Sequence, residues 1–168
     1  TVFQKEKESS KSFILSHEIL PDIAILDPEL MMDLPKKIIV SSGLDAITHC
    51  VEGYVSILSN AMTDDFSEKA LVMLFENFEN YLENPNDLDL IFIMQRASNY
   101  AGIVQNISTP GLAHAIAHNL ASFNIMHGLA CGLTLPSTIK INAKNEKIRL
   151  KYDKLSKILG YKDYLDLA

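Results

Sequence analysis

The segment Gly111-Leu-Ala-His114-Ala-Ile-Ala-His118-Asn-Leu-Ala-Ser-Phe-Asn-Ile-Met-His127-Gly128 holds three of the chain's five histidines. His114 and His118 are four residues apart, a spacing that places both imidazoles on one face of an α-helix. His127 follows a short connection and directly precedes Gly128, where the chain can turn back towards the first two. Three imidazoles in this arrangement can bind one cation. The alternative is that they are core histidines with ordinary hydrogen bonds.

A second stretch upstream repeats the spacing with a carboxylate and a histidine. In Gly43-Leu-Asp45-Ala-Ile-Thr-His49-Cys-Val-Glu-Gly-Tyr54, Asp45 and His49 are again four residues apart. Burying both groups on an apolar helix is costly without a cation. Because the two stretches together hold four of the five histidines, we favour a metal site over core histidines. Cys131, four residues after His127, is either a soft ligand or a small core residue.

The composition is that of one globular domain with a hydrophobic core: 168 residues, 48% apolar and 21% charged. The net charge of −6 and the absence of a basic patch argue against nucleic acid as a partner. Polar residues interrupt the apolar stretches, so we expect no membrane span, and the charged N-terminus is unlike a signal peptide. Two distant cysteines without a CxxC pair favour a reduced, cytoplasmic protein.

The hydrophobic periodicity predicts a few strands followed by helices. Residues 1–27 are expected to be strand, with a hairpin around the charged turn 5–10 and then a buried strand over residues 22–26. Asp27 and Pro28 are typical of a helix start, as N-cap and first helical residue. Beyond them the pattern predicts helices over residues 40–58, 66–82, 88–107, the segment that contains His114, 127–142 and 144–159. We therefore expect a mainly α chain with a boundary near residue 27.

Several short motifs occur in a fixed order along the chain. They are Pro21-Asp-Ile-Ala-Ile-Leu-Asp27-Pro-Glu-Leu30, the stretch 43–54, Thr63-Asp64, Ala101-Gly102, the stretch 111–118, Ile125-Met-His127-Gly128 and Leu135-Pro136. In this order, over residues 12–142, they resemble the iron-containing (group III) alcohol dehydrogenases. Each motif alone is weak, whereas the ordered combination is highly specific.

The resemblance implies a fold and a division into domains. The fold is the helical metal-binding domain of the dehydroquinate synthase-like, iron alcohol dehydrogenase type, preceded by a few β-strands. Residues 1–27 correspond to the last strands of an incomplete α/β NAD(P)-binding domain. Residues 28–168 correspond to the helical domain, truncated at its C-terminus.

The resemblance also implies the site and its reaction. The metal ligands map onto Asp45, His49, His114 and His127, and His118 maps onto a catalytic, non-ligand histidine beside the nicotinamide and the substrate. The expected metal is Fe²⁺, with Zn²⁺ possible for these donors. The expected reaction oxidises a small alcohol to an aldehyde or ketone by hydride transfer to NAD or NADP, with the metal as Lewis acid. A homo-oligomer, in the simplest case a dimer, is expected.

The chain departs from the family pattern in some places. The family's Gly-Gly-Gly-Ser type pyrophosphate segment and its Thr-Gly-Ser-Glu type stretch are missing, and Met126 stands where proline is common. We therefore expect a partial enzyme that does not bind NAD(P) on its own. Glu52 and Asp64 fall in matched segments and are interpreted as structural, in capping or in hydrogen bonds to ligands.

Two other functions fit parts of the pattern. A metallohydrolase would use the metal to activate water, but the zinc-protease helix needs a glutamate directly after its first histidine, where Ala115 stands. A non-catalytic helical module would bind a metal for structure, or none, and act through contacts with other proteins. Metal-dependent folding without nucleotide-linked activity would identify such a module.

Overall fold

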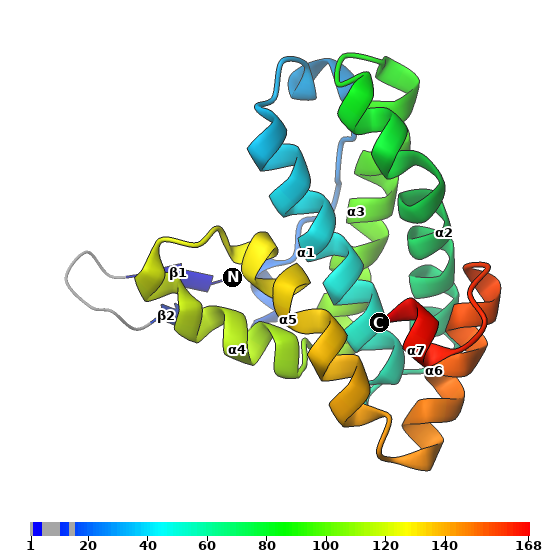
Figure 1. Ribbon diagram of the computed structural model, residues 1–168. Coiled ribbons are helices and arrows are strands. Elements are labelled where there is room, and N and C mark those ends of the chain that lie inside the picture. The colour runs from blue at the N-terminus through cyan, green and yellow to red at the C-terminus, as the bar shows by residue number, and fades with distance from the viewer. Residues whose placement is uncertain (1, 5–10, 14–15) are drawn as a thin grey trace.

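Helices make up most of the described chain, which comprises residues 2–4, 11–13 and 16–168 of a computed structural model (Figure 1). The helices are α1 (Lys36–Val55), α2 (Ala61–Glu83), α3 (Leu88–Ser108), α4 (Leu112–Leu120), α5 (His127–Asn142), α6 (Glu146–Ile158) and α7 (Tyr164–Leu167). Short 3₁₀ turns are η1 (His17–Ile19), η2 (Pro28–Met31) and η3 (Ala121–Phe123). Strands β1 (Val2–Gln4) and β2 (Lys11–Phe13) pair antiparallel, with Phe3 opposite Ser12. The all-helical character predicted for the greater part of the chain is confirmed.

Side-chain caps fix several helix starts at the polar breaks of the sequence. Asn60 accepts from the backbone N–H of Thr63, and the Thr63 hydroxyl accepts from the N–H of Asn60, so α2 begins with a capping box. Asp87 and Asn145 cap α3 and α6 from one side only, each by accepting two backbone N–H bonds. Asp27 caps η2, with Pro28 at its first position as predicted.

The main core lies between α1, α2 and α3, which pack side by side (Figure 1), with α5, α6 and α7 against them. Its most deeply buried side chains, all at most 1% exposed, include Tyr54, Leu71, Leu74, Ile91, Tyr152 and Leu155. Helix α4 packs chiefly on α5, and both contact α1. A second, small apolar cluster of Ala117, Ala130 and Cys131 joins α4 to α5. The site described below lies where these three helices meet.

Polar contacts tie α6 to α1 and α2. The hydroxyl of Tyr54 donates to Glu68 Oε1 across 2.7 Å, and Lys154 Nζ donates to the same oxygen across 2.7 Å. Lys151 Nζ lies 2.9 Å from Asp64 Oδ2. Asp64 thus joins α2 to α6 through a lysine, and this contact differs from the capping or ligand hydrogen bond that was predicted for it.

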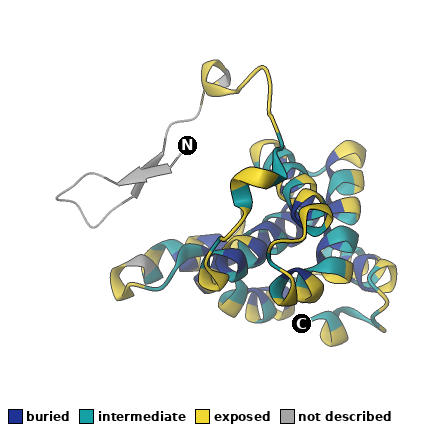
Figure 2. Cartoon of the chain, turned by 90° about the horizontal axis from the view of Figure 1, so that it is seen from above, coloured by how far each residue is buried: buried dark blue, intermediate teal, exposed yellow. Residues whose placement is uncertain are grey.

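The prediction of a buried strand over residues 22–26 is wrong. This segment runs extended without strand pairing, and Ile23 and Ile25 are 79% and 85% exposed. Figure 2 shows the exposed chain ahead of α1 beside helices that bury their inner faces. An apolar run is stable as a strand only when a neighbouring strand satisfies its backbone groups, and none in the described chain does so. The turn predicted over residues 5–10 lies outside the described residues.

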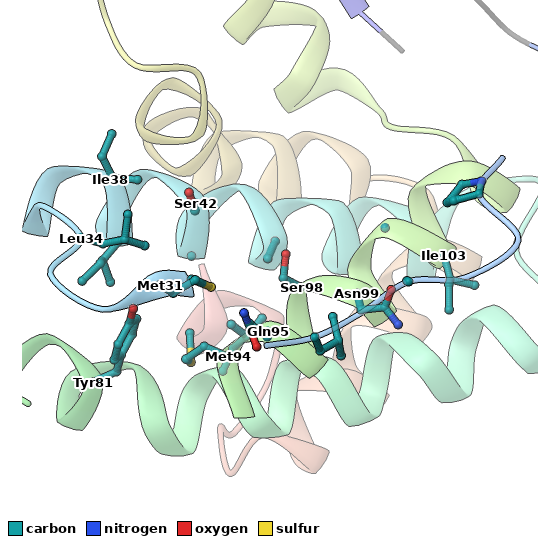
Figure 3. Close-up of a pocket in the computed structure, with 18 of the residues that line it drawn as sticks. Met31, Leu34, Ile38, Ser42, Tyr81, Met94, Gln95, Ser98, Asn99 and Ile103 are labelled. Carbon is teal, nitrogen blue, oxygen red and sulfur yellow. The ribbon is translucent and has the colours of Figure 1, made fainter. Parts of the chain in front are cut away.

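A cavity of about 670 Å³ lies between residues 20–34 and the faces of α1 and α3 (Figure 3). Its lining is mostly apolar, with Met31, Leu34, Ile38 and Met94 among the contributors. Gln95 closes one side, because its side-chain amide donates to the carbonyl of Asp27 across 2.8 Å. The cavity is separate from the histidines, since Asp45, His49, His114, His118 and His127 are all absent from its lining.

No helix in the described part of the chain combines the length and the hydrophobicity that crossing a bilayer requires.

Candidate metal centre

Three helices bring the predicted site residues together. Helix α1 carries Asp45 and His49 one turn apart, α4 carries His114 and His118 in the same relation, and α5 begins at His127. The sequence spacing predicted each pair correctly as neighbours on one helix face. The packing of α4 and α5 against α1 then determines which donor atoms meet.

Donor atoms of Asp45, His114, His127 and Cys131 lie within 4.8 Å of one another. Asp45 Oδ1 is 3.4 Å from His114 Nε2 and 3.6 Å from His127 Nε2. Cys131 Sγ is 3.6 Å from His127 Nε2. Ligands at about 2.1 Å from a tetrahedral ion are about 3.4 Å apart, so these separations suit a single shared cation.

Two of these atoms are buried polar groups that a cation would satisfy. Asp45 Oδ1 and His114 Nε2 face each other, and neither has a hydrogen-bond partner in the described chain. The other ring nitrogen of His114, Nδ1, is 2.7 Å from Glu52 Oε2. When Nδ1 donates to Glu52, the lone pair on Nε2 points at a carboxylate oxygen. A positive charge between the two removes this repulsion, so the residues fit a divalent metal ion.

His49 and His118 lie beside this group of four. The His49 ring stacks on His114 with centroids 4.3 Å apart, and its Nδ1 is 4.0 Å from Asp45 Oδ2. The His118 ring stacks on His127 at 5.0 Å. All the histidines predicted for the site are therefore in contact with it. The assignment of His49 as a ligand and of His118 as a non-ligand stays a prediction.

The electrostatics of the site favour a positive charge at its centre. Burial lowers the pKa of His114, but its polar contacts with Asp45, Cys131 and Glu52 outweigh this effect and raise the pKa to about 11. Burial raises the pKa of Asp45, yet the close approach of His114 and the charges of the nearby histidines hold it below the usual 3.8. In the metal-free chain a proton on the His114 ring can supply the positive charge beside Asp45; a bound metal ion would supply it instead and use the lone pair on Nε2.

Two further pKa values bear on which side chains can act as ligands. Burial lowers the pKa of His49 to about 4, so its imidazole is neutral and keeps a lone pair for a metal. Burial raises the pKa of the Cys131 thiol, which disfavours the thiolate that binds metals. The sequence left Cys131 open as soft ligand or core residue. The structure puts it in the small apolar cluster and beside the donors.

Comparison with known proteins gives one family match and many similar chains. Residues 39–166 match the model of the Fe-containing alcohol dehydrogenase family, C-terminal. The 1-propanol dehydrogenase PduQ of Salmonella typhimurium is 35% identical over 149 residues, which are 88% of this chain and 40% of that protein. Alcohol dehydrogenase 4 of Saccharomyces cerevisiae is 30% identical over 161 residues, 95% of this chain and 42% of that protein.

Solved structures give the same result. An iron-containing alcohol dehydrogenase from Thermococcus thioreducens superposes with a TM-score of 0.91 at 29% identity, covering 99% of this chain and 43% of that one. A sulfoacetaldehyde reductase from Bifidobacterium kashiwanohense, solved in complex with NAD⁺, superposes with a TM-score of 0.87 at 29% identity, covering 94% and 42%. The chain thus spans about two fifths of the length of these relatives.

Proposed function

The chain belongs to the Fe-containing alcohol dehydrogenase family, and from this premise we propose that it is the metal-holding helical part of an NAD(P)-dependent alcohol dehydrogenase. The observation that carries the proposal is the convergence of Asp45, His114 and His127 donor atoms from three helices. Buried ligand-type atoms without a partner, Asp45 Oδ1 and His114 Nε2, support a cation there over a purely structural contact.

We assign Asp45, His49, His114 and His127 as the metal ligands. Three of them already face one another, and His49 adjoins them through Asp45. One carboxylate and three imidazoles form a mixed oxygen and nitrogen set that suits Fe²⁺, the metal of the family's name, and also Zn²⁺. Cys131 is the alternative fourth donor, disfavoured by its protonated thiol.

When bound, the cation supplies Lewis-acid chemistry that polarises the oxygen of an alcohol or aldehyde during hydride exchange with the nicotinamide. The chain's own residues orient the donors around that oxygen. Ala113 and Ala117, which directly precede His114 and His118 in α4, are at most 1% exposed and anchor the helix in the two apolar clusters. We assign His118, stacked against His127, the role of holding or moving a proton between the substrate hydroxyl and solvent.

The relatives support the cofactor and the substrate class that we propose, whereas the assembly is our expectation from the family resemblance. One of them was solved with NAD⁺ and others are named for alcohols and aldehydes. We assign a small alcohol or aldehyde as substrate and NAD or NADP as cofactor. Residues 28–168 are the metal-binding domain, residues 1–27 belong to the NAD(P)-binding domain, and the enzyme is a homo-oligomer, in the simplest case a dimer.

Metal content per chain tests the proposal. The chain is purified without oxygen, reconstituted with Fe²⁺ or Zn²⁺, freed of excess ion and measured by elemental analysis. We expect one ion per chain in the wild type and in His118→Ala, and its loss in His114→Ala. His118→Ala is the matched control, because it removes a histidine from the same helix that is assigned no metal bond. Trace metal in the wild type after reconstitution refutes the proposal.

A further inference from the structure

Glu52 is a buried carboxylate that sits between two of the helices that carry ligands. It lies on α1, two turns after Asp45, and is only 3% exposed. Its oxygens accept from the backbone N–H groups of Gly111 and Ala113, at 2.8 and 2.6 Å, and from that of His114 at 3.4 Å. A fourth contact joins Oε2 to His114 Nδ1 at 2.7 Å. One side chain of α1 therefore holds both the start of α4 and the ring of a ligand on α4.

The backbone contacts fix where α4 begins. The first N–H groups of a helix have no partner within the helix, and the positive end of the helix dipole attracts a carboxylate. Glu52 meets both needs, and the approach depends on Gly111, since a Cβ there would lie 2.8 Å from Glu52 Oε1. The position of α4 relative to Asp45 is thus set by this carboxylate.

The contact to the ring fixes which nitrogen of His114 faces the site. A carboxylate at Nδ1 accepts a hydrogen bond and stabilises the tautomer with its proton on Nδ1. Nε2 then carries the lone pair, and Nε2 is the atom 3.4 Å from Asp45 Oδ1. The opposite tautomer would place an N–H where the metal is expected.

We propose that Glu52 is the positioning residue of the metal centre, which sets the tautomer of His114 and the placement of α4 so that Nε2 and Asp45 Oδ1 meet at one ion. This inference rests on the proposed metal site and adds the device that assembles it. Asp45 and His114 lie on different helices, and Glu52 bonds directly from the helix of the first to the backbone and ring of the second.

The test is the substitution Glu52→Gln, measured by titration of the whole chain with Fe²⁺ and with Zn²⁺. Glutamine has the same size, but its NH₂ group cannot accept a hydrogen bond. With the NH₂ group in place of Oε1, the N–H of Ala113 loses its acceptor. With the NH₂ group in place of Oε2, His114 Nδ1 and the N–H of Gly111 lose theirs. Loss of such a ligand-orienting partner lowers metal affinity by about 10–100-fold, and we expect a loss in this range. Glu68→Gln is the matched control: it removes the charge of another partly buried glutamate, on α2, whose partners are Tyr54 and Lys154. Its metal affinity should equal that of the wild type.

A second measurement uses only the wild-type chain, so it tests the inference even if Glu52→Gln fails to fold. Nitrogen-15 NMR of the Zn²⁺-loaded wild type should show His114 bound through Nε2 with a proton on Nδ1. Binding through Nδ1, or unchanged affinity in a folded Glu52→Gln, overturns the inference and leaves the metal site standing. A wild-type chain that binds neither ion overturns the proposed function as well.

Discussion

Gly128, which directly follows His127, allows α5 to lie against α1 at the candidate metal site. A Cβ at this position would lie 1.8 Å from the carbonyl oxygen of Ser41 and 2.9 Å from Asp45 Cβ. Real Cβ atoms do not approach other atoms closer than 3.0 Å, and Ser41 contributes rigid helix backbone here. The substitution Gly128→Ala therefore forces the start of α5 away from α1 by more than roughly 1 Å.

Two losses should follow from this displacement. Overpacking against a backbone costs about 3 kcal/mol, the upper end of the usual range, which lowers Tm by about 6–12 °C for a chain of this size. His127 moves with α5, so its distance of 3.6 Å from Asp45 grows. Since metal sites tolerate deviations of only about 0.2 Å, we expect Zn²⁺ affinity to fall by at least about tenfold. Thermal unfolding and Zn²⁺ titration measure the two effects.

Gly102→Ala is the control, because it makes the same chemical change at a glycine that has open space around the added methyl group. Gly102 lies within α3, and a Cβ there would meet no atom within 4 Å. Alanine in a helix interior is favoured over glycine by about 1 kcal/mol, so this variant should be slightly more stable and bind Zn²⁺ as the wild type does. If Gly128→Ala has the same Tm and the same Zn²⁺ affinity as Gly102→Ala, the close approach of α5 to α1 does not hold the site together.

Three further outcomes are expected. Zn²⁺ at one hundred times its Kd should raise the free energy of unfolding by about 2.7 kcal/mol, or Tm by about 5–11 °C, and a chelator should reverse this shift. A Tm that changes with neither Zn²⁺ nor chelator refutes a metal site in the folded chain. Cys131→Ser should keep the Zn²⁺ affinity that His127→Ala loses, because burial raises the pKa of the thiol and keeps it protonated; equal loss in both would make Cys131 a ligand. Burial raises the pKa of Glu68, but hydrogen bonds from Lys154 and Tyr54 outweigh burial and hold the pKa below its ordinary 4.5. Glu68 therefore stabilises the fold above pH 4.5, a contribution lost as the pH falls through the folded-state pKa, and unfolding of Glu68→Gln against pH should show that this difference from the wild type vanishes in acid.

Local spacing predicted what lies within one helix and no more. The four-residue intervals placed Asp45 near His49 and His114 near His118, since helix geometry alone fixes those neighbours. Which donor atoms converge depends on side-chain torsions and on the distance between helices. His49 stacks on His114 instead of completing the group of four, and Cys131 joins that group. The four-residue spacing of Cys131 from His127 allowed this contact, but spacing alone does not decide which of Cys131 and His49 has its donor atom nearer to the other three.

The error over residues 22–26 has a related cause. An apolar run such as Ile23-Ala-Ile25 has the side chains that a buried strand needs. A strand also needs a neighbouring strand that forms hydrogen bonds with its backbone. That neighbour is a property of the sheet, and the run itself contains no information about it. The longer helices were predicted near their true positions because each one satisfies its own backbone, so periodicity was sufficient evidence that they exist. Their ends were less accurate: α2 begins at Ala61, five residues before the predicted start.

The same contrast explains why the donors of the candidate metal site converge in a chain that spans about two fifths of its relatives. Asp45, His114 and His127 come from α1, α4 and α5, and the contacts that position them also come from these helices. Glu52 joins α1 to α4, and the Ala117, Ala130 and Cys131 cluster joins α4 to α5. Because each link is made by short side chains or by backbone N–H groups, little torsional freedom remains between the ligands. Metal binding should therefore be a property of this helical unit itself, whereas hydride transfer also requires a group that can present a nicotinamide to it.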